Sequence, residues 1–363
     1  MSIAACKVAA EPDAASAPLQ IVQCGGEARA MWDSYVARHP EGTFFHRYGW
    51  ADVIADAYGY EPLYLMARRG GEIAGLLPLI DVKAPLLGQS LISTAFTVGG
   101  GPIGDDDEAV NALAQEAVRF GEERRVRYVE LRGEGAPLDG WAQKQGVYAV
   151  FRKALPADEE ENFNMMPKRR RADIRKALKS EQSGELRVRC DNDPDAFYAL
   201  YARALRDHGT PIFPKRFLSA LTSAFNGDIE FSFVDYQGKP VAGLLTFYDR
   251  EKVLPYYIGA APEARTCRAP DLIMWSLMRR AAARGATLFD FGRSKVGSGP
   301  YQFKKLWGFE ATPLSYQYKL IAAAETPNVN PNNPKFNMFV KGWRRLPLTV
   351  ANRAGPLLAR NFP

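Results

Sequence analysis

Apolar and polar residues alternate along two stretches of the chain that align with each other without a gap. The first stretch covers residues 62–77 and the second covers residues 230–245. In each, two runs of alternating apolar residues flank a glycine turn, at Gly70 and at Gly238, and the stretch ends in Ala-Gly-Leu-Leu. Alternation around a glycine turn predicts a β-hairpin, and the shared sequence indicates an internal duplication.

The agreement between the two parts of the chain continues on both sides of the hairpins. Amphipathic periodicity predicts helices over residues 109–123 and 271–284, and each leads into a short apolar strand, at residues 128–131 and 288–291. Further helical stretches precede each hairpin, at residues 31–37 and 49–58 in the first part and at residues 195–206 and 214–225 in the second. Each half therefore reads helices, hairpin, strand, helix, strand.

This element order predicts an α/β protein with mixed sheets flanked by helices. The order is similar to that of the Gcn5-related N-acetyltransferase (GNAT) fold, here in tandem. A length of 363 residues allows two such cores. We expect a disordered N-terminus over residues 1–18, a first GNAT-like domain over 19–155, a second one with the catalytic motif over 156–325, and a basic tail over 326–363.

Composition excludes several other classes of protein. Hydrophobic residues make up 47% of the chain and charged residues 24%, as in soluble globular proteins, and no apolar run approaches the 18 residues of a membrane span. The first residues have no cationic region and carry acids, so we expect no secretion signal and a cytoplasmic protein. Four dispersed cysteines without a C-x-x-C pair indicate reduced thiols, and the three histidines lack metal-ligand spacing, so we expect no metal site.

The charge is distributed unevenly. Residues 330–363 hold six cations and no acid, which equals the formal net charge of +6, so the rest of the chain is balanced. Within that balanced part, the acidic run 158–161 is followed by the basic run 168–171. Such a step is typical of a solvated linker that leads into an exposed helix, and an anion site is the alternative.

The basic tail has two interpretations. Phe336, Phe339, Val340 and Trp343 recur at helical spacing, with Lys341, Arg344 and Arg345 nearby, which would suit peripheral contact with an anionic inner-membrane surface. The alternative is a tail folded across the first domain, covering its core. Both interpretations stay open at this point.

Several motifs together resemble the FemAB family, over about residues 20–322. The closest similarity is to the FemAB-like proteins associated with exosortase and PEP-CTERM systems of exopolysaccharide-producing bacteria, and the tail segments 330–335 and 346–353 share it. The motifs are Phe-Phe-His-Arg-Tyr-Gly-Trp (44–50), Ile-Ala-Gly-Leu-Leu-Pro (73–78), the basic segment 168–177, His-Gly-Thr-Pro (208–211), Phe-Asp-Phe-Gly-Arg-Ser (289–294) and Gly-Pro-Tyr-Gln-Phe-Lys-Lys-Leu-Trp-Gly-Phe (299–309).

The resemblance implies amide-bond formation: aminoacyl or acyl transfer to an amine of a peptidoglycan, exopolysaccharide or other cell-envelope precursor, which can be lipid-linked. Lys304 falls on the family's functional Phe-Lys position, with Phe303 as its packing neighbour. A cation there would stabilise the oxyanion of the tetrahedral intermediate. A surface lysine beside aromatic residues is the alternative, and the alignment places Lys305 toward solvent.

Other residues are candidates for substrate binding. Arg293 and Ser294 follow a strand end, where Arg293 would bind phosphate or carboxylate unless it pairs with Asp290. Of Tyr256 and Tyr257, strand alternation points one inward, where it would contact substrate or pack in the core. Three further candidates complete the set, Tyr301 beside the Phe-Lys position and the helix residues Arg170 and Arg171, which would hold a diphosphate or nucleic-acid backbone or lie on a solvated face.

The glycine-containing turns before the two predicted helices 109–123 and 271–284 indicate which acyl donor the protein uses. Acyl-CoA enzymes of this fold hold the pyrophosphate on free N–H groups at a helix N-terminus. In the second half, the turn over residues 259–271 contains Pro262 and Pro270, which have no N–H donor, and Asp271 adds a charge that repels a phosphate. In the first half, the glycine-rich turn over residues 99–104 is followed by acids at residues 105–108. We therefore expect no bound cofactor, and aminoacyl-tRNA or another activated acyl donor rather than acyl-CoA. A CoA-dependent N-acetyltransferase and a non-catalytic membrane- or nucleic-acid-binding protein are the alternative functions.

Overall fold

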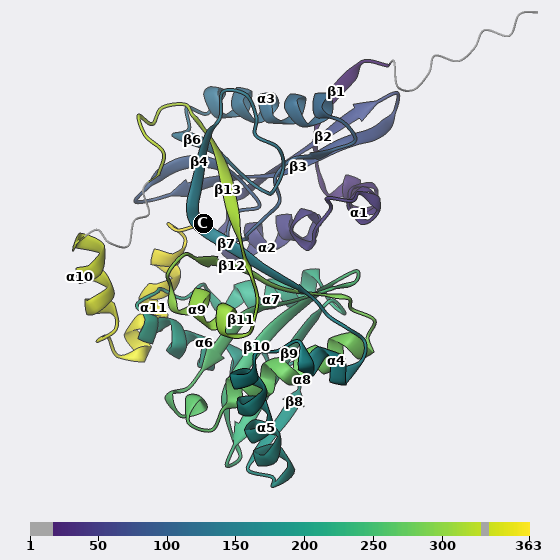
Figure 1. The fold of residues 1–363 in the computed structure, drawn as a ribbon. Helices are drawn as coiled ribbons and strands as arrows, with labels where there is room; N and C mark the ends of the chain where they lie inside the picture. Colours follow the sequence, from purple (N-terminus) through teal and green to yellow (C-terminus); the bar gives the residue numbers. More distant parts are fainter. Residues whose placement is uncertain (1–16, 328–333) are drawn as a thin grey trace, which may run out of the picture.

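The computed structural model describes residues 17–327 and 334–363, so part of the expected disordered N-terminus and of the tail lies outside the described residues. The strands form one mixed sheet in the order β1-β2-β3-β4-β6-β13-β7-β12-β11-β10-β9-β8, with β5 paired to β3 (Figure 1). The strands are β1 (Leu19–Cys24), β2 (Glu61–Arg69), β3 (Glu72–Ala84), β4 (Gly88–Ser93), β5 (Ile103–Gly104), β6 (Tyr128–Arg132), β7 (Ala142–Ala154), β8 (Leu186–Cys190), β9 (Ile229–Tyr236), β10 (Lys239–Asp249), β11 (Lys252–Ala260), β12 (Leu288–Lys295) and β13 (Ala311–Leu320).

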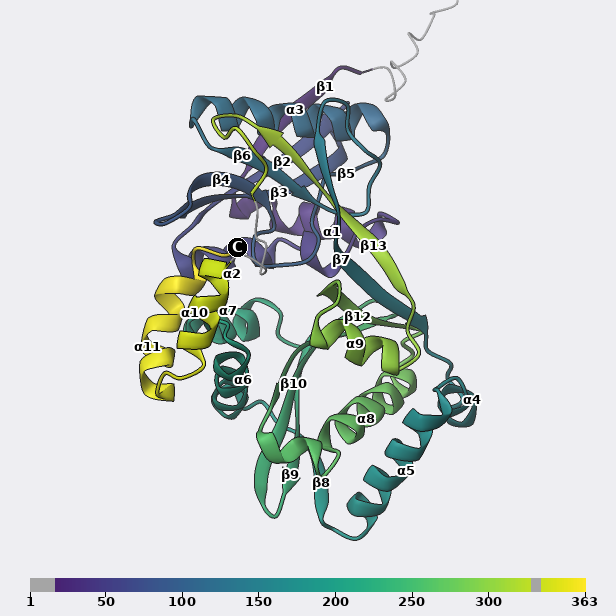
Figure 2. The ribbon, with the colours of Figure 1, turned by 60° about the vertical axis from the view of Figure 1, so that its left-hand side comes forward.

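Helices cover the sheet in both halves (Figure 2). They are α1 (Arg29–Arg38), α2 (Gly49–Tyr58), α3 (Asp107–Glu123), α4 (Glu159–Asn164), α5 (Lys168–Gln182), α6 (Pro194–His208), α7 (Lys215–Ala224), α8 (Ala269–Ala283), α9 (Gly299–Leu306), α10 (Pro334–Trp343) and α11 (Leu348–Ala359). Short 3₁₀ turns are η2 (Gly26–Ala28), η3 (Phe44–His46) and η4 (Pro262–Arg265). The mixed α/β class and the tandem order expected from the sequence are confirmed.

The two predicted hairpins are present and share their turn chemistry. In β2–β3 the turn residues Gly70 and Gly71 both have positive φ, and in β9–β10 Gln237 and Gly238 do. Positive φ at both central turn positions matches the right-handed twist of the flanking strands. Both faces of β2 and β3 are buried, with Leu63 and Leu65 in one apolar cluster and Tyr64 and Met66 in another.

Each half contains a parallel strand pair that separates soon after it forms. Strands β4 and β6 align over Leu91↔Val129 and Ile92↔Glu130, and strands β11 and β12 align over Lys252↔Leu288 and Val253↔Phe289. Beyond these positions the register is not continued, so the strands diverge toward their carboxyl ends. Each half therefore has an opening in its sheet between neighbouring strand ends, where ligands bind in open α/β sheets.

Two strands join the halves into one sheet. Strand β7 belongs to the first half in sequence but pairs with β12 of the second half, and β13 belongs to the second half but pairs with β6 and β7 of the first. In Figures 1 and 2, β7 and β13 run from the upper part of the molecule into the lower part. The domain limits at 155/156 and 325/326 stay a prediction, since the sheet is continuous across the first of them.

Aromatic side chains fill the junction between the halves. The ring of Phe44, in η3, lies 4.6 Å from that of Phe225 and 4.5 Å from that of Phe247, and Trp50 packs against the same two rings. Phe44, Trp50 and Phe247 are completely buried. The Phe44–Trp50 motif therefore ties the first half to the core of the second.

The tail packs against both halves. Helix α11 lies along α6, and Val340 of α10 contacts the backbone at Gly209, while Trp343 is buried. Farther on, the hydroxyl of Tyr60 donates to the carbonyl oxygen of Arg360 over 2.8 Å. The side chain of Phe336, which belongs to the apolar face predicted for the tail, lies outside the described residues. The described part of that face, Phe339, Val340 and Trp343, contacts protein.

Candidate active site

Lys304 lies on α9 with its side chain directed into the protein. Its Nζ donates to the carbonyl oxygens of Phe291 at 2.6 Å, Gly292 at 3.1 Å and Arg293 at 3.0 Å. The residue is only 8% exposed, whereas Lys305 is exposed beside the Tyr301 ring. All three ammonium protons are therefore bound to one loop of β12, the segment Phe291–Arg293, which we call the carbonyl loop.

The carbonyl loop exists because β12 contains an extra residue. Its register with β7 shifts between Asp290 and Arg293, and Gly292 has φ of 63°, a conformation that glycine adopts without strain. The side chain of Asp290 accepts from the backbone N–H of Gly292 at 2.7 Å and from Nε of Arg152 at 2.8 Å. Lys304 and Asp290 thus fix the loop from two directions.

The environment of Lys304 alters its proton affinity. Burial lowers the pKa of Lys304 from 10.5 to about 7, with a smaller lowering by the guanidinium of Arg293, and the carboxylate of Asp290 acts in the opposite direction. The rings of Phe151 and Phe291 lie 5.4 and 5.8 Å from its Nζ. A lysine whose charge is poised near neutral pH is an uncommon feature and is typical of functional sites.

Arg293, at the end of the carbonyl loop, reaches the junction between the halves. Its Nη1 donates to the Tyr316 hydroxyl at 2.6 Å, and its guanidinium lies 4.5 Å from the centre of the Tyr148 ring. Within residues 17–327 and 334–363, no carboxylate comes within 4.0 Å of it as an ion-pair partner. The alternative expectation of an Arg293–Asp290 pair is therefore not met, because Asp290 binds Arg152.

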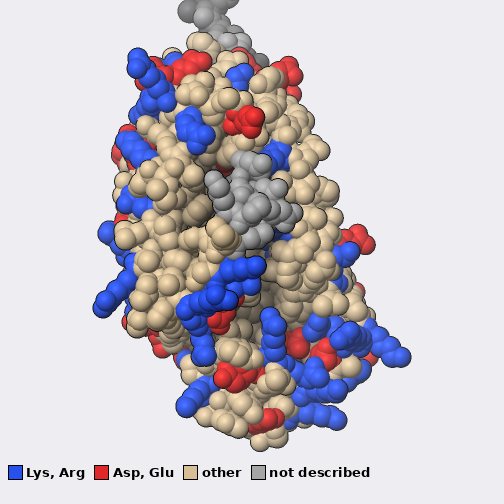
Figure 3. Space-filling view, turned by 90° about the vertical axis from the view of Figure 1, so that its left-hand side faces the viewer, with Lys and Arg blue, Asp and Glu red and all other residues tan. Residues whose placement is uncertain are grey.

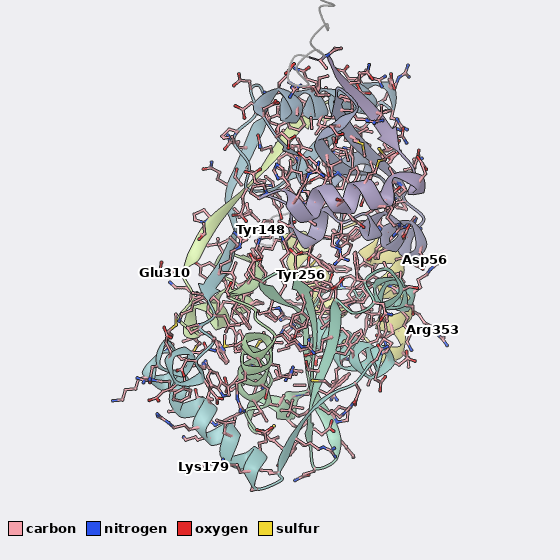
Figure 4. The ribbon with its side chains drawn as sticks, turned by 90° about the vertical axis from the view of Figure 1, so that its right-hand side faces the viewer. Asp56, Tyr148, Lys179, Tyr256, Glu310 and Arg353 are labelled. Atoms are coloured by element: carbon pink, nitrogen blue, oxygen red, sulfur yellow. The ribbon has the colours of Figure 1, made fainter. Side chains whose placement is uncertain are left out.

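Tyr256 and Tyr257 lie where β11 leaves the register of β10. Leu245 pairs with Tyr257 and Thr246 with Pro255, so Tyr256 is an unpaired bulge residue. Both rings join the junction aromatics, Tyr256 against Phe45 and Phe247 and Tyr257 against Tyr201 and Phe213, and Figure 4 places Tyr256 and Tyr148 between the halves. The expectation that only one ring points inward was wrong, because a bulge breaks the alternation on which it relied.

The remaining residues near the Phe-Lys position pack closely. Phe303 is half-buried against the rings of Phe291 and Trp307, as a packing neighbour would be. The Tyr301 ring lies 5.2 Å from that of Phe151. The hydroxyl of Ser294 is buried and has no hydrogen-bond partner among the described residues. Their roles toward a substrate stay predictions.

Arg170 and Arg171 have different surroundings. Arg170 is 9% exposed, pairs with Asp271 at the start of α8, and stacks on the Trp307 ring. Arg171 is half-buried and donates to the side-chain oxygen of Asn164 at 3.0 Å. The geometry therefore separates the two residues that the sequence grouped, because Arg170 is held by protein groups at the interface of α5 with α8.

The first turn of α8 offers little to a diphosphate. Arg268 precedes it in the left-handed conformation, with φ of 62°, and its carbonyl oxygen accepts from the backbone N–H groups of Asp271 and Leu272. Asp173 of α5 pairs with Arg268, so two ion pairs, Arg170–Asp271 and Arg268–Asp173, hold α5 against this turn. The N–H groups and charges that would bind a pyrophosphate are thus engaged within the protein.

A cavity of about 390 Å³ lies beside Arg293, within the junction. We call it the aromatic cavity. Its walls come from α2, α6, α7, β11, the loop after β4 and the tail. The aromatic side chains that line it are Tyr58, Phe96, Tyr201, Phe213, Phe217 and Tyr257, and the tail adds Phe339, Ala359, Phe362 and Pro363.

A larger cavity of about 680 Å³ lies in the first half, at the start of α3. Its lining includes five acids and no lysine or arginine, and the acids are Glu41, Asp105, Asp106, Asp107 and Asp139. A phosphate or a carboxylate would be repelled there. The aromatic cavity is therefore the better candidate for an anionic substrate.

The surface of the molecule is basic in two places. Helix α5 exposes Lys168, Arg169, Arg175, Lys176 and Lys179, and the tail exposes Lys341, Arg344, Arg345 and Arg353. Lys and Arg side chains gather over the lower part of the face seen in Figure 3, and Lys179 lies at the far end of α5 in Figure 4. No helix within the described ranges is long and apolar enough to cross a membrane, and no three His, Cys, Asp or Glu side chains there gather as a metal site requires.

Several residues of this site carry no local signal in the sequence. Tyr316 and Tyr148 come from β13 and β7, which meet Arg293 only because the halves exchange strands. The tail residues that line the aromatic cavity are more than 60 residues away in sequence from Arg293, except Phe339. Asp290 had a signal, since an acid within the motif Phe-Asp-Phe-Gly-Arg-Ser is unusual on a buried strand.

Comparison with known proteins places this geometry in a known fold. Residues 168–305 match the family described as acetyltransferase (GNAT) domain. None of the curated proteins matches the chain in sequence. The match covers α5 to α9, including the carbonyl loop and Lys304.

Solved structures extend the likeness to most of the chain. FemX is similar at 16% identity and a TM-score of 0.65, over 82% of this chain and 96% of that one. A tandem GNAT protein from the clavulanic acid biosynthesis pathway is similar at 11% identity and a TM-score of 0.53, over 85% and 100% of the chains. The C-terminal DUF2156 domain assigned to a lysylphosphatidylglycerol synthetase from Agrobacterium fabrum is similar at 14% identity and a TM-score of 0.53, over 80% of this chain and 91% of that one. The chain thus has the tandem GNAT acyltransferase fold.

Proposed function

We propose that this tandem GNAT-fold chain is an acyltransferase that forms an amide bond, moving an aminoacyl or other activated acyl group to an amine of a cell-envelope precursor. One observation carries the proposal. The diverging pair β11 and β12 ends at a loop that holds two cations, Lys304 and Arg293, beside a cavity of ligand size. The likeness to FemX and to the GNAT domain model supports the reaction class.

The reaction needs positive charge where oxygen becomes negative. The acceptor amine attacks the carbonyl carbon of the donor ester, a C–N bond forms, the ester C–O bond breaks, and the amine proton passes to the leaving oxygen. A fixed cation beside the transient oxyanion lowers the barrier by about 3 to 4 kcal/mol. Among the described residues Arg293 has no carboxylate partner, so it is the cation available to bind an anionic group of the acceptor.

Lys304 then has a distinct part in the reaction. Its three protons are bound by the carbonyl loop, so direct contact with the oxyanion would require the release of one carbonyl oxygen. We infer that Lys304 positions the loop, and with it Arg293, and adds positive potential in a poorly solvated region. Phe303 and Tyr301 pack around α9 and support this placement.

Aminoacyl-tRNA or another activated acyl ester is the donor that the site suits best. In the first turn of α8, the backbone N–H groups of Asp271 and Leu272 already donate to the carbonyl oxygen of Arg268, and the side chain of Asp271 is paired with Arg170. Both features disfavour binding of a CoA diphosphate. The exposed cations of α5 support binding of a nucleic-acid backbone. No resident cofactor or metal is needed for aminolysis of an ester.

The acceptor class follows from the fold neighbours and the basic surfaces. The relatives FemX and the lysylphosphatidylglycerol synthetase domain support a peptidoglycan or other envelope precursor, including a lipid-linked one. A cytoplasmic protein that contacts the inner membrane through the cations of the tail would meet such an acceptor. The association with exosortase systems rests on the sequence resemblance alone.

The test is transfer of a radiolabelled acyl group into an alkali-stable product, because amides survive conditions that hydrolyse the donor ester. Purified protein is incubated with labelled alanyl-tRNA or labelled acetyl-CoA and an extract of envelope precursors. We expect label from the tRNA arm, with mass spectrometry identifying the amide. Label only from acetyl-CoA, together with a thermal shift by CoA below millimolar concentration, would favour the N-acetyltransferase. No product from either donor, with Lys304 dispensable in vivo, would favour a binding protein.

A further inference from the structure

The two halves carry equivalent arginines with opposite surroundings. In the first half, β6 presents Glu130 and then Arg132, and the two side chains form a buried ion pair at 2.7 Å. In the second half, β12 presents Asp290 and then Arg293, with Phe291 and the extra residue Gly292 between them. Asp290 instead binds Arg152, its cross-strand partner on β7, so among the described residues Arg293 lacks the counter-charge that its equivalent keeps.

Arg293 without its acid lies at the wall of the aromatic cavity. The cavity is lined by eight aromatic rings, two of them from the tail, and the guanidinium of Arg293 is the only charged side chain in that lining among the described residues. A cation in apolar surroundings is unfavourable until an anion joins it. The cavity volume of about 390 Å³ falls within the range of roughly 300–1,000 Å³ that small-molecule sites have.

The shape of the cavity is maintained at a conformational cost. Phe96 has φ of 68°, in the left-handed region that bulky residues avoid, and this conformation stacks its ring on Tyr58 with centroids 4.0 Å apart. Phe362 and Pro363 of the tail line the same cavity, and Arg132 donates to the carbonyl oxygen of Pro363 at 2.8 Å. The tail therefore contributes a wall to the cavity and is held there by the first half.

We propose that the aromatic cavity binds an amphiphilic anion, a carboxylate or phosphate monoester carried on an apolar chain or ring, with the anion on Arg293. This ligand rests on the proposed function, as the part of the acceptor that anchors it while its amine reacts. The apolar part lies among the aromatic rings. The headgroup can be a carboxylate or a phosphate ester, and the experiment distinguishes them.

The test is calorimetric titration of the full chain with acetate, hexanoate, octanoate, octyl phosphate and 1-octanol, each below its micelle concentration. We expect affinity to rise about threefold to fourfold for each added methylene until the cavity is filled. Octanoate or octyl phosphate should bind at least tenfold tighter than octanol, and the tighter of the two identifies the headgroup. Equal affinity for acetate and octanoate, or for octanol and both anions, would overturn the proposal.

Variants separate the head and tail of the ligand. Arg293→Gln should abolish the preference for the anions over octanol, and Arg293→Lys should keep it. Ala359→Trp narrows the cavity and should reduce octanoate binding at least tenfold, whereas Leu357→Trp, on the exposed face of the same helix, should not change it. Equal effects of the two tryptophans would refute the assignment of the cavity.

Failure of this inference can be distinguished from failure of the proposed function. The titrations need neither donor nor turnover. If octanoate binds as expected but no donor yields an amide, the ligand assignment stands and the transferase is wrong. If an amide forms and none of the amphiphiles binds or competes, the transferase stands and the amphiphile site is wrong.

Discussion

Lys304→Ala compared with Lys305→Ala provides the sharpest test of the carbonyl loop. The two lysines are neighbours on α9, but Lys304 is buried with three carbonyl acceptors, whereas Lys305 is exposed. Composition and formal charge change identically in the two variants. Any difference between them therefore reports the position of the side chain.

The effect of Lys304→Ala on stability can be estimated from the contacts. Hydrogen bonds from a charged donor contribute about 1.5 to 3 kcal/mol each, so three contribute about 4.5 to 9 kcal/mol. Burial of the charge opposes this, and lowering the pKa from 10.5 to about 7 corresponds to about 5 kcal/mol. The net loss of unfolding free energy is thus about 0 to 4 kcal/mol for Lys304→Ala, and about 0.5 kcal/mol or less for Lys305→Ala.

The effect on activity should be larger than the effect on stability. Lys304→Ala removes positive potential from the region of the oxyanion and displaces the carbonyl loop, and loss of one oxyanion-stabilising group lowers kcat by about 10²- to 10³-fold. We expect that loss for Lys304→Ala, and turnover close to that of the wild type for Lys305→Ala. The assay is alkali-stable label transfer per folded molecule, with the folded fraction taken from urea denaturation followed by circular dichroism.

Three results would refute this reasoning. Wild-type turnover in folded Lys304→Ala would show that the carbonyl loop is not needed for transfer. Reversed responses of the two lysine variants would show that the motif alignment is displaced by one residue. Loss of activity that only parallels loss of the folded state would reduce Lys304 to a structural residue.

Four further predictions follow from other contacts. Arg293→Ala should raise the acceptor KM about tenfold or more with little change in melting temperature, and a fall in both together would indicate a structural role. Arg170→Ala should lower the unfolding free energy by about 3 to 5 kcal/mol in urea titrations because it leaves Asp271 buried without its partner, and a loss below 1 kcal/mol would contradict the buried pair. The folded state binds fewer protons at Lys304 than the unfolded state between about pH 7 and 10.5, so the unfolding free energy of the wild type should rise with pH relative to Lys304→Met, and parallel pH profiles would disprove the lowered pKa. The full chain should co-sediment with anionic vesicles and not with neutral ones, a chain ending at residue 329 should lose this co-sedimentation, and unchanged vesicle binding with a melting temperature several degrees lower would leave the tail a purely structural role.

Local patterns in the sequence predicted the individual helices and strands well, but they predicted less of how the strands pair in the sheet. The hairpins around Gly70 and Gly238 were predictable because alternation and turn chemistry act within a few residues. The position of Lys304 in the motif pointed to a functional lysine, but its burial follows from the bulge at Gly292, which is set by pairing with β7. Strand exchange is a long-range property that residue periodicity does not encode.

Charge patterns predicted surfaces but misjudged individual partners. The basic segment 168–171 suggested an exposed helix or an anion site, whereas the helical period buries Arg170 against Asp271, exposes Lys168 and Arg169 and leaves Arg171 half-buried. The sequence left two interpretations of the tail, contact with a membrane and contact with the rest of the protein. In the structure Trp343 is buried in the protein. Which side of an amphipathic helix meets protein depends on surfaces that form elsewhere in the chain.

The position of β13 has a consequence for how the chain becomes structured during synthesis. It is the last strand in sequence, yet it lies between β6 and β7, with partners that are synthesised more than 150 residues earlier. Until it arrives, β6 and β7 each have an unpaired edge, and such edges associate with other chains. Contacts so distant in sequence also slow folding. A ribosome paused before residue 311 would therefore present an open sheet, and we expect the nascent chain to need protection over that interval.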